Sequence, residues 1–297
     1  RAILEGLHFD GSAVDGFARV AESDMLLVPD PATFAVLPWF SEGQRTARMI
    51  CDVRMPHGDP FIGDPRGALM KVLSQAESMG YTFKIGTEVE FFLFHTDADN
   101  RPVIATPHDR SGYYDLSEDS AQVIRHAMLS TLEDMGIAVT ATHSEIGDGQ
   151  HEIDFVYQPA LQAADDFASV RVALRTIAQR YGLHCTFMPR PSADRPGSGM
   201  HTHQSLHDLE TDANVFADTG QEYGLSDVAR HFMAGQLAHA RAMTAVLAPL
   251  VNSYKRLGTS FEAPVNVSWA HINRAALIRV PGVAEGREQH TRLEMRS

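Results

Sequence analysis

Five short stretches of this chain place a carboxylate, an imidazole or a guanidinium group at alternate or near-alternate residues. In a β-strand, alternate side chains point to the same face, so most of these stretches would present a polar face where a buried strand normally presents an apolar one. The stretches are Glu88-Val89-Glu90, Glu145 with Glu152-Ile153-Asp154, His201-Thr202-His203, Arg274 with Arg279, and Arg292-Leu293-Glu294-Met295-Arg296. If these faces converge, they line a pocket that needs cations and anions for charge balance. The pattern therefore indicates divalent metals together with a phosphate-bearing substrate.

The pair Glu88 and Glu90 is the sharpest of these signals. Two carboxylates 4 Å apart repel by about 4 kcal/mol at an effective dielectric constant of 20. A solvated edge of an antiparallel sheet would tolerate them, and for the pair alone this alternative stays open. The apolar run Phe91-Phe92-Leu93-Phe94 that follows favours a central strand instead. Carboxylate oxygens are the ligands that Mg²⁺ and Mn²⁺ prefer.

The composition narrows the class of protein. The chain has 297 residues, 44% of them hydrophobic and 21% charged, which suffices for one large domain or two smaller ones. The net charge of −13 argues against nucleic acid as a partner, and no apolar run approaches the roughly 20 residues of a membrane span. No signal peptide is visible, and Cys51 and Cys185 suggest no disulfide framework, so we expect a cytoplasmic protein. The chain starts without Met and stops at Ser297 after a strand-like run, so we expect a fragment of a longer protein.

Helix and strand patterns alternate along most of the chain. Before a break at residues 56–60, only strands and loops are predicted, over Met25–Val28, Thr33–Pro38 and Ala47–Arg54. Helices are predicted from Asp64-Pro65 to Gly80 and over Ser120–Met135, Ala160–Tyr181 and Ser226–Leu247. The later strands are predicted over Phe83–Phe94, Ala138–His143, His151–Tyr157, His184–Met188, Gly199–His207, Val265–Trp269, Ala276–Val280 and Arg292–Arg296. This order predicts an α+β fold with a curved antiparallel sheet and flanking helices.

The other motifs each have a less specific interpretation when taken alone. The loop from Glu145 to Glu152 is as typical of a solvated acidic loop as of a metal site. The pair His201 and His203 could belong to a surface strand, since the chain has 15 histidines. Basic residues usually form a solvated face, but here arginines stand among apolar strand residues, where an unpaired charge is costly. Guanidinium groups in such places suit carboxylate or phosphate ligands.

Taken together, the motifs resemble those of the glutamine synthetase family, in its order and with near-family spacing. They are Phe9-Asp10-Gly11-Ser12, Gly86-Thr87-Glu88-Val89-Glu90-Phe91-Phe92, Gly149-Gln150-His151-Glu152, Gly197-Ser198-Gly199-Met200-His201-Thr202-His203, Asn252–Leu257, Glu262-Ala263-Pro264, Asn273-Arg274 and Arg292–Arg296. The chain is similar to the prokaryotic type I-like branch, which includes paralogues that use amines other than ammonia. The resemblance implies a partial N-terminal β-grasp domain over residues 1–57 and a C-terminally truncated catalytic domain over residues 58–297. It also implies a homo-oligomer of two stacked hexamers.

The resemblance implies roles for individual residues. The metal nearest the glutamate would be held by Glu90, Glu145 and Glu152, and the metal that bridges the ATP phosphates by Glu88, His201 and Glu294. Glutamate would be bound by Arg256, Arg296 and Gly197, and nucleotide by His203, Arg279 and Arg292. Arg274 would face the transferring phosphate, Glu262 would accept a proton from ammonium, Asp10 would reach the ammonium site of a neighbouring subunit, and Tyr113 would line that site. The implied cofactors are ATP and two or three Mg²⁺ or Mn²⁺ ions per site.

The resemblance implies ATP-dependent ligation of ammonia to the γ-carboxylate of glutamate through γ-glutamyl phosphate. Four departures from the family pattern stand at Ala13, Asp148, Arg190 and Ser260. Ala13 in place of the usual serine leaves room for a larger amine, so a γ-glutamylpolyamine or other γ-glutamylamide synthetase is the alternative. A non-catalytic structural relative is a third possibility, although all six matched metal-ligand positions are kept. Because crowded carboxylates repel, we also expect Glu294→Ala to remove ATP turnover and leave the fold intact.

Overall fold

The computed structural model describes residues 5–13, 24–40, 45–115, 120–258 and 263–296. The chain divides into two compact units. The first comprises Arg1–Gly80 with Asp134–Gly136, and the second comprises Tyr81–Glu133 with Ile137–Ser297. The first unit thus includes the helix that follows the proline-rich break.

The first unit is built on small antiparallel sheets. Strands β1 (Leu7–Asp10), β2 (Asp24–Pro29) and β5 (Cys51–Arg54) pair in the order β1-β2-β5, and β3 (Ala35–Val36) pairs with β4 (Ala47–Arg48). Helix α2 (Pro65–Ser78) begins as the sequence predicts, because the Asp64 side chain accepts a hydrogen bond from the Arg66 N–H and proline occupies the first turn. The Arg66 guanidinium also pairs with Asp30 at 2.7 Å and with Asp52, so it ties α2 to the β-strand region.

The second unit contains a ten-stranded sheet in which β6 is the central strand. The main path runs β13-β14-β15-β12-β6-β9-β8, and β7, β10 and β11 also pair with β6. The strands are β6 (Tyr81–Thr96), β7 (Pro102–Pro107), β8 (Val139–Ser144), β9 (Gln150–Phe155), β10 (Gln158–Pro159), β11 (Leu183–Thr186), β12 (Met200–Asp208), β13 (Trp269–His271), β14 (Ile278–Val280) and β15 (Leu293–Arg296). The described pairings are antiparallel except for β13 with β14, which is parallel.

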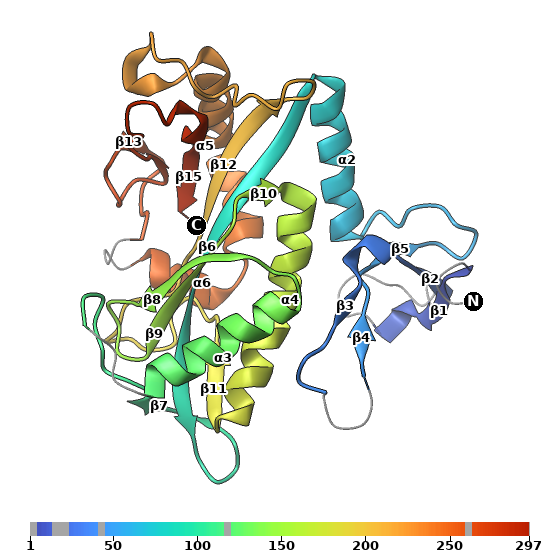
Figure 1. The fold of residues 1–297 in the computed structure, drawn as a ribbon, viewed down its shortest axis with the longest axis vertical. Coiled ribbons are helices and arrows are strands. Elements are labelled where there is room, and N and C mark those ends of the chain that lie inside the picture. Colours follow the sequence, from blue (N-terminus) through green and yellow to red (C-terminus); the bar gives the residue numbers. More distant parts are fainter. Residues whose placement is uncertain (1–4, 14–23, 41–44, 116–119, 259–262, 297) are drawn as a thin grey trace. The chain divides into compact units, whose positions relative to one another are not determined.

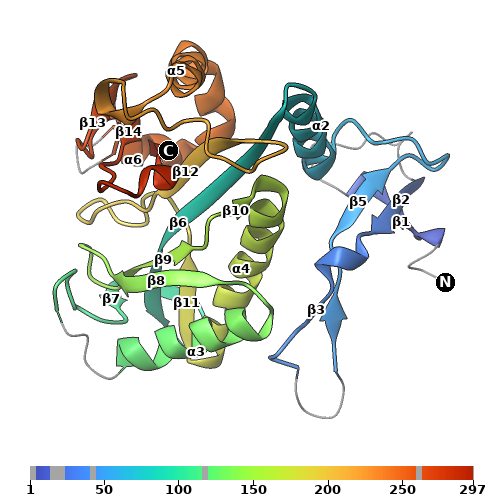
Figure 2. The same ribbon diagram turned by 45° about the horizontal axis from the view of Figure 1, so that its top comes forward.

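The helices of the second unit cover different parts of this sheet. They are α3 (Ser120–Asp134), α4 (Ala160–Arg180), α5 (Asp227–Leu247) and α6 (Val251–Leu257). Figures 1 and 2 show α3 and α4 near β8, β9 and β11, and α5 beside β12 and β15. Helix α4 packs on β11 and β6. Residues of α5 and of β14 and β15 share a buried apolar cluster with members such as Met233, Ile278 and Leu293. The apolar faces therefore support a sheet whose other positions are free for polar groups.

The α+β class and most predicted elements are confirmed. The predicted strand over Val265–Trp269 is wrong in position, because β13 covers Trp269–His271 and pairs with Ile278–Val280. The sequence did not predict α6, β1, β7 and β10, which are short or begin or end at proline. Among the described residues, no helix is both long and apolar enough to cross a membrane.

Candidate metal and anion site

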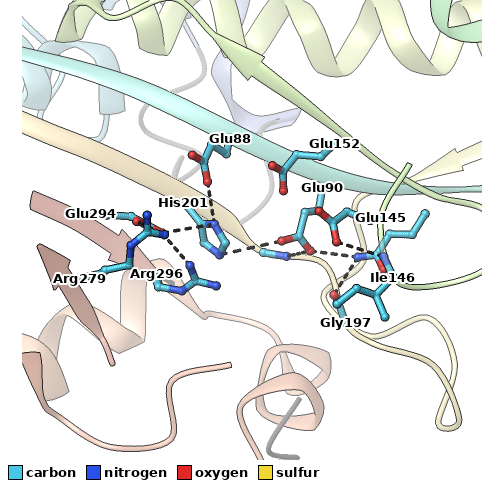
Figure 3. Close-up of polar contacts among 12 residues, drawn as sticks. Glu88, Glu90, Glu145, Ile146, Glu152, Gly197, His201, Arg279, Glu294 and Arg296 are labelled. Carbon is cyan, nitrogen blue, oxygen red and sulfur yellow. Dashed lines mark hydrogen bonds and ion pairs between the residues drawn. The ribbon is translucent and has the colours of Figure 1, made fainter. Parts of the chain in front are cut away.

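Strand pairing brings the alternating polar residues onto one face of the sheet. Opposite Glu88 on β6 lie His201 on β12 and Asp154 on β9, and opposite His201 lies Arg296 on β15. Residues directly opposite each other in antiparallel strands share a face and lie close together. A row of charged and imidazole groups therefore crosses four strands, and part of it is drawn in Figure 3.

A second row runs parallel to the first. Glu90 on β6 faces Glu152 on β9, which in turn faces His143 on β8. Val89 and Ile153 are paired on the opposite face and are buried. The period of two thus separates an apolar face from a charged face on the same strands, as the sequence predicts.

The Glu88 carboxylate is contacted by two imidazoles. Nδ1 of His201 lies 3.0 Å from its Oε2, and Nε2 of His203 lies 2.5 Å from its Oε1. Burial alone would raise the pKa of Glu88, but these hydrogen bonds outweigh burial and hold the pKa well below its usual value. Glu88 is therefore an ionised carboxylate with both oxygens directed at ring nitrogens.

Glu294 is fully buried and lies between two arginines. Arg296 Nη1 lies 2.8 Å from its Oε1, and Arg279 Nη1 lies 2.9 Å from its Oε2. His201 Nδ1 is also within 3.8 Å of Glu294. The two guanidinium groups compensate the charge of a carboxylate that water cannot reach.

Glu90 is held by amide groups. The Gly199 N–H and the Gln150 side-chain amide both donate to its Oε2, each at 3.0 Å. Burial, with the neighbouring charge of Glu152, raises the pKa of Glu90 to about 8. A carboxylate in this state binds a proton or a cation at neutral pH.

His143, Glu145 and Glu152 form another group of close donors. The ring of His143 lies 3.6 Å from Glu145 and 3.4 Å from Glu152, and the Tyr113 ring packs edge-on against it at 4.7 Å. The hydrogen bond to Glu152 raises the pKa of His143 to about 9 despite burial. Tyr113 therefore lies beside acidic metal-ligand candidates.

The residues fit divalent cations. Ligand atoms of Glu88, His203 and Glu294 lie within 4.8 Å of one another, and so do those of His143, Glu145 and Glu152. Carboxylate oxygen with some imidazole suits Mg²⁺ or Mn²⁺. The donor atoms group differently from the expected ligand sets, since His203 and His143 join the clusters while His201 reaches both Glu88 and Glu90. The expected sets stay a prediction.

Among the described residues of the second unit, two cavities adjoin this charged face. One of about 530 Å³ is lined by Glu88, Asp154, Tyr157, His203 and Arg292, among others. The other, of about 600 Å³, is lined by Glu90, Gly199, Arg256 and many apolar side chains. The wall of each cavity thus contains a glutamate of β6 and an arginine, namely Glu88 with Arg292 and Glu90 with Arg256. The donor groups around both cavities are of the kinds that suit divalent cations next to anionic groups.

The structure also positions the other predicted residues. Arg256 on α6 is 8% exposed, and Gly197 accepts a hydrogen bond from Gln150 through its carbonyl. Arg292 donates through Nε to His203 at 3.1 Å. Arg274 is exposed and lies near enough to Tyr113 to lower its pKa, although burial and Glu145 raise that pKa overall.

Two predicted residues are not joined to the site by the described structure. Glu262 lies outside the described residues. Asp10 belongs to the first unit, at the end of β1, where Ser12 donates to its carboxylate from N–H at 2.9 Å and from the hydroxyl at 2.6 Å. Those hydrogen bonds lower the pKa of Asp10. The predicted roles of both residues stay predictions.

Four residues at these sites had no role in the sequence-based prediction. His143 continues the alternation back from Glu145, so a signal for it was present, and Asp154 was noted in the alternation without a role. Gln150 and Tyr157 are uncharged, and their position depends on which strands pair. The Tyr157 hydroxyl contacts Ser205 and lies 3.4 Å from His207.

The sequence matches two family models. Residues 1–56 match the β-grasp domain of glutamine synthetase and residues 62–297 match its catalytic domain. The glutamine synthetase of Halobacterium salinarum is 51% identical over 286 residues, and that of Thermotoga maritima is 47% identical over 296 residues. The alignments cover 96% and 99% of this chain and 63% and 66% of the two relatives, so the chain spans just under two thirds of their length.

Solved structures agree with these matches. A Plasmodium falciparum glutamine synthetase has a TM-score of 0.87 at 25% identity, covering 99% of this chain and 62% of that chain. A structure described as apo GmaS without ligand has a TM-score of 0.84 at 32% identity, covering 99% and 66%. The chain belongs to the glutamine synthetase family.

Proposed function

We propose that the protein containing this chain uses ATP to join ammonia to the γ-carboxylate of glutamate, with γ-glutamyl phosphate as the intermediate. The observation that carries the proposal is the one-faced array on β6, β9, β12 and β15, in which carboxylates for cations adjoin arginines for anions. The names of the relatives support the same reaction.

The first step is a phosphoryl transfer. A γ-carboxylate oxygen of glutamate attacks the γ-phosphorus of ATP, and the bond from phosphorus to the oxygen of ADP breaks. Divalent cations, when bound, would neutralise the charge of the phosphates. Glu88, His201 and Glu294 would hold one of them, and Glu90, Glu145 and Glu152 the other. Arg274 and Arg279 would add positive charge on the phosphate side.

In this proposal, each of the two cavities binds a different substrate. The cavity with His203, Tyr157 and Arg292 would take the nucleotide. The cavity with Glu90, Gly199 and Arg256 would take glutamate, since the buried Arg256 is suited to a carboxylate. Arg296 and Gly197 would complete the glutamate site.

The second step is attack of the amine on the acyl carbon. Asp10 of a neighbouring subunit would hold ammonium, Tyr113 would line the amine site, and Glu262 would take a proton from ammonium to give ammonia. The ammonia nitrogen then forms the new bond, inorganic phosphate leaves with the former carboxylate oxygen, and the nitrogen loses a second proton to the solvent. The active assembly would then be a homo-oligomer in the cytoplasm. The predicted domain boundary near residue 57 would lie within the first compact unit, which extends to Gly80.

A steady-state assay of the full-length protein tests this proposal. Ammonium, putrescine and ethanolamine are compared as acceptors at fixed ATP, glutamate and Mg²⁺ or Mn²⁺. We expect glutamate-dependent ADP release with ammonium as the best acceptor. Turnover with the larger amines and none with ammonium would instead favour a γ-glutamylamide synthetase. No turnover and no saturable Mn²⁺ binding by calorimetry would favour a structural relative.

A further inference from the structure

The side-chain amide of Asn252, in the first turn of α6, makes two hydrogen bonds with the backbone of Arg190, which lies 62 positions earlier in the chain. Its Oδ1 accepts from the Arg190 N–H at 2.7 Å, and its Nδ2 donates to the Arg190 carbonyl at 2.9 Å. These are the two bonds that a neighbouring strand would give Arg190. An asparagine amide satisfies both because it carries a donor and an acceptor.

The loop that Asn252 contacts is closed on itself. The Ser198 N–H donates to the Pro189 carbonyl at 2.9 Å, and Nη2 of the buried Arg190 donates to the Ala193 carbonyl at 2.8 Å. The backbone of residues 189–198 is therefore held at its two ends and from within. Fixing Arg190 fixes the position of the glycine-rich end of this loop.

The glycine-rich end of the loop packs closely against Arg256 of α6, with no room for an added Cβ atom at Gly197 or Gly199. A Cβ added to Gly199 would lie 2.5 Å from Nη2 of Arg256, and one added to Gly197 would lie 2.8 Å from Cγ of Arg256. Gly199 also donates its N–H to Glu90. The loop thus lies between the Arg256 guanidinium and the carboxylate face of β6.

Asn252 and Arg256 are four residues apart on α6, so they lie on the same side of the helix. Both side chains are directed at the same loop, Asn252 at its start and Arg256 at its end. A shift of α6 along the loop would break the first contact and misplace the second. Placing a charged group within a fraction of an ångström is what substrate orientation requires.

We propose that Asn252 is a positioning residue, which sets the place of Arg256 against the loop of residues 189–199. The proposal rests on the proposed function, because it takes Arg256 to bind a carboxylate of glutamate. Arg190 contributes its backbone to Asn252 and its side chain to the loop. The role of Asn252 is distinct from substrate contact.

The test compares Asn252→Ala, Asn252→Asp and Val251→Ala in the full-length protein. Asn252→Ala removes both hydrogen bonds, Asn252→Asp keeps the acceptor, and Val251→Ala is the control on the same helix at an exposed position. We expect Asn252→Ala to raise the KM for glutamate about tenfold or more, which is the loss typical of a misplaced binding group. The KM for ATP should stay within about twofold, and Asn252→Asp should lie between wild type and alanine.

Some results would contradict the positioning role of Asn252, and another would contradict the proposed function. If Asn252→Ala lowers the melting temperature but leaves both KM values unchanged, the residue is only structural and the positioning role is wrong. Equal increases in the KM for glutamate and ATP would also contradict it. Absence of glutamate-dependent turnover in the wild-type protein would instead contradict the proposed function.

Discussion

Glu90 on β6 and Glu152 on β9 are direct partners across antiparallel strands, and both carboxylates lie on the same face of the sheet. Burial and the charge of Glu152 raise the pKa of Glu90 to about 8. Two buried carboxylates in this arrangement stabilise each other only with a proton or a cation between them. The pair therefore makes the fold sensitive to both pH and divalent metals.

The metal-free protein should lose stability as the pH rises from about 4.5 to about 8. The folded pKa of Glu90 is above its unfolded value of 4.5, so protonated Glu90 stabilises the fold fully below pH 4.5 and the contribution is lost as the pH rises through about 8. Asp154, with a pKa raised to about 7, and His143, with one raised to about 9, act in the same direction. Thermal unfolding with and without Mg²⁺ over this range measures the effect.

The same shift predicts proton release on metal binding. At pH 7, binding of Mn²⁺ should release about one proton, because the ligand must be deprotonated. Calorimetry in buffers of different ionisation enthalpy counts the protons. Glu90→Gln is the control, and it should reduce the pH dependence of the metal-free protein to the part that comes from Asp154 and His143 and reduce the proton release. A wild-type protein that is most stable at pH 8 without metal would contradict the assignment.

Glu294→Ala should abolish ATP turnover and also destabilise the fold. Glu294 is fully buried and pairs with two guanidinium groups, so its removal leaves Arg279 and Arg296 without their shared carboxylate. Breaking a buried ion pair costs about 3–5 kcal/mol. The sequence predicted that this variant keeps its fold. The buried ion pairs instead predict that it loses stability.

Denaturant unfolding of the metal-free variants measures this change. Glu294→Gln, which keeps the shape and one acceptor oxygen, should lose less stability than Glu294→Ala while still losing turnover. If the alanine variant unfolds at the wild-type denaturant concentration, the arginines do not depend on Glu294.

Gly199→Ala should weaken glutamate binding. The added methyl carbon would lie 2.5 Å from Nη2 of Arg256, so the guanidinium must move. We expect the KM for glutamate to rise by about tenfold or more. Gly235→Ala on α5 is the matched control, because its Cβ meets nothing within 4 Å and alanine favours a helix. Equal KM values for the two variants would show that Arg256 is not placed against Gly199 as the structure has it.

Local periodicity predicted much of the site because the site is built on strands. Alternation of charged residues identified the polar face of β6, β12 and β15, and the Asp64-Pro65 pair identified the start of α2. These signals depend only on near neighbours in the chain. The acidic and basic site candidates were identified from these local signals together with the family resemblance.

Long-range pairing accounts for what could not be predicted. The contact between Asn252 and Arg190 joins residues 62 positions apart, and nothing in either local sequence shows it. Gln150 reaches both Glu90 and Gly197 only because β6 and β9 are neighbours. The seven-residue α6 is too short for a periodic pattern.

The most direct test of the central claim follows an oxygen atom. Glutamate labelled with ¹⁸O in its γ-carboxylate is incubated with ATP, ammonium and Mg²⁺ in the presence of the full-length protein, and the phosphate released is analysed by mass spectrometry. Ligation through γ-glutamyl phosphate predicts that each phosphate carries one ¹⁸O from the carboxylate. Release of phosphate without the label, at a rate independent of glutamate, would contradict the account.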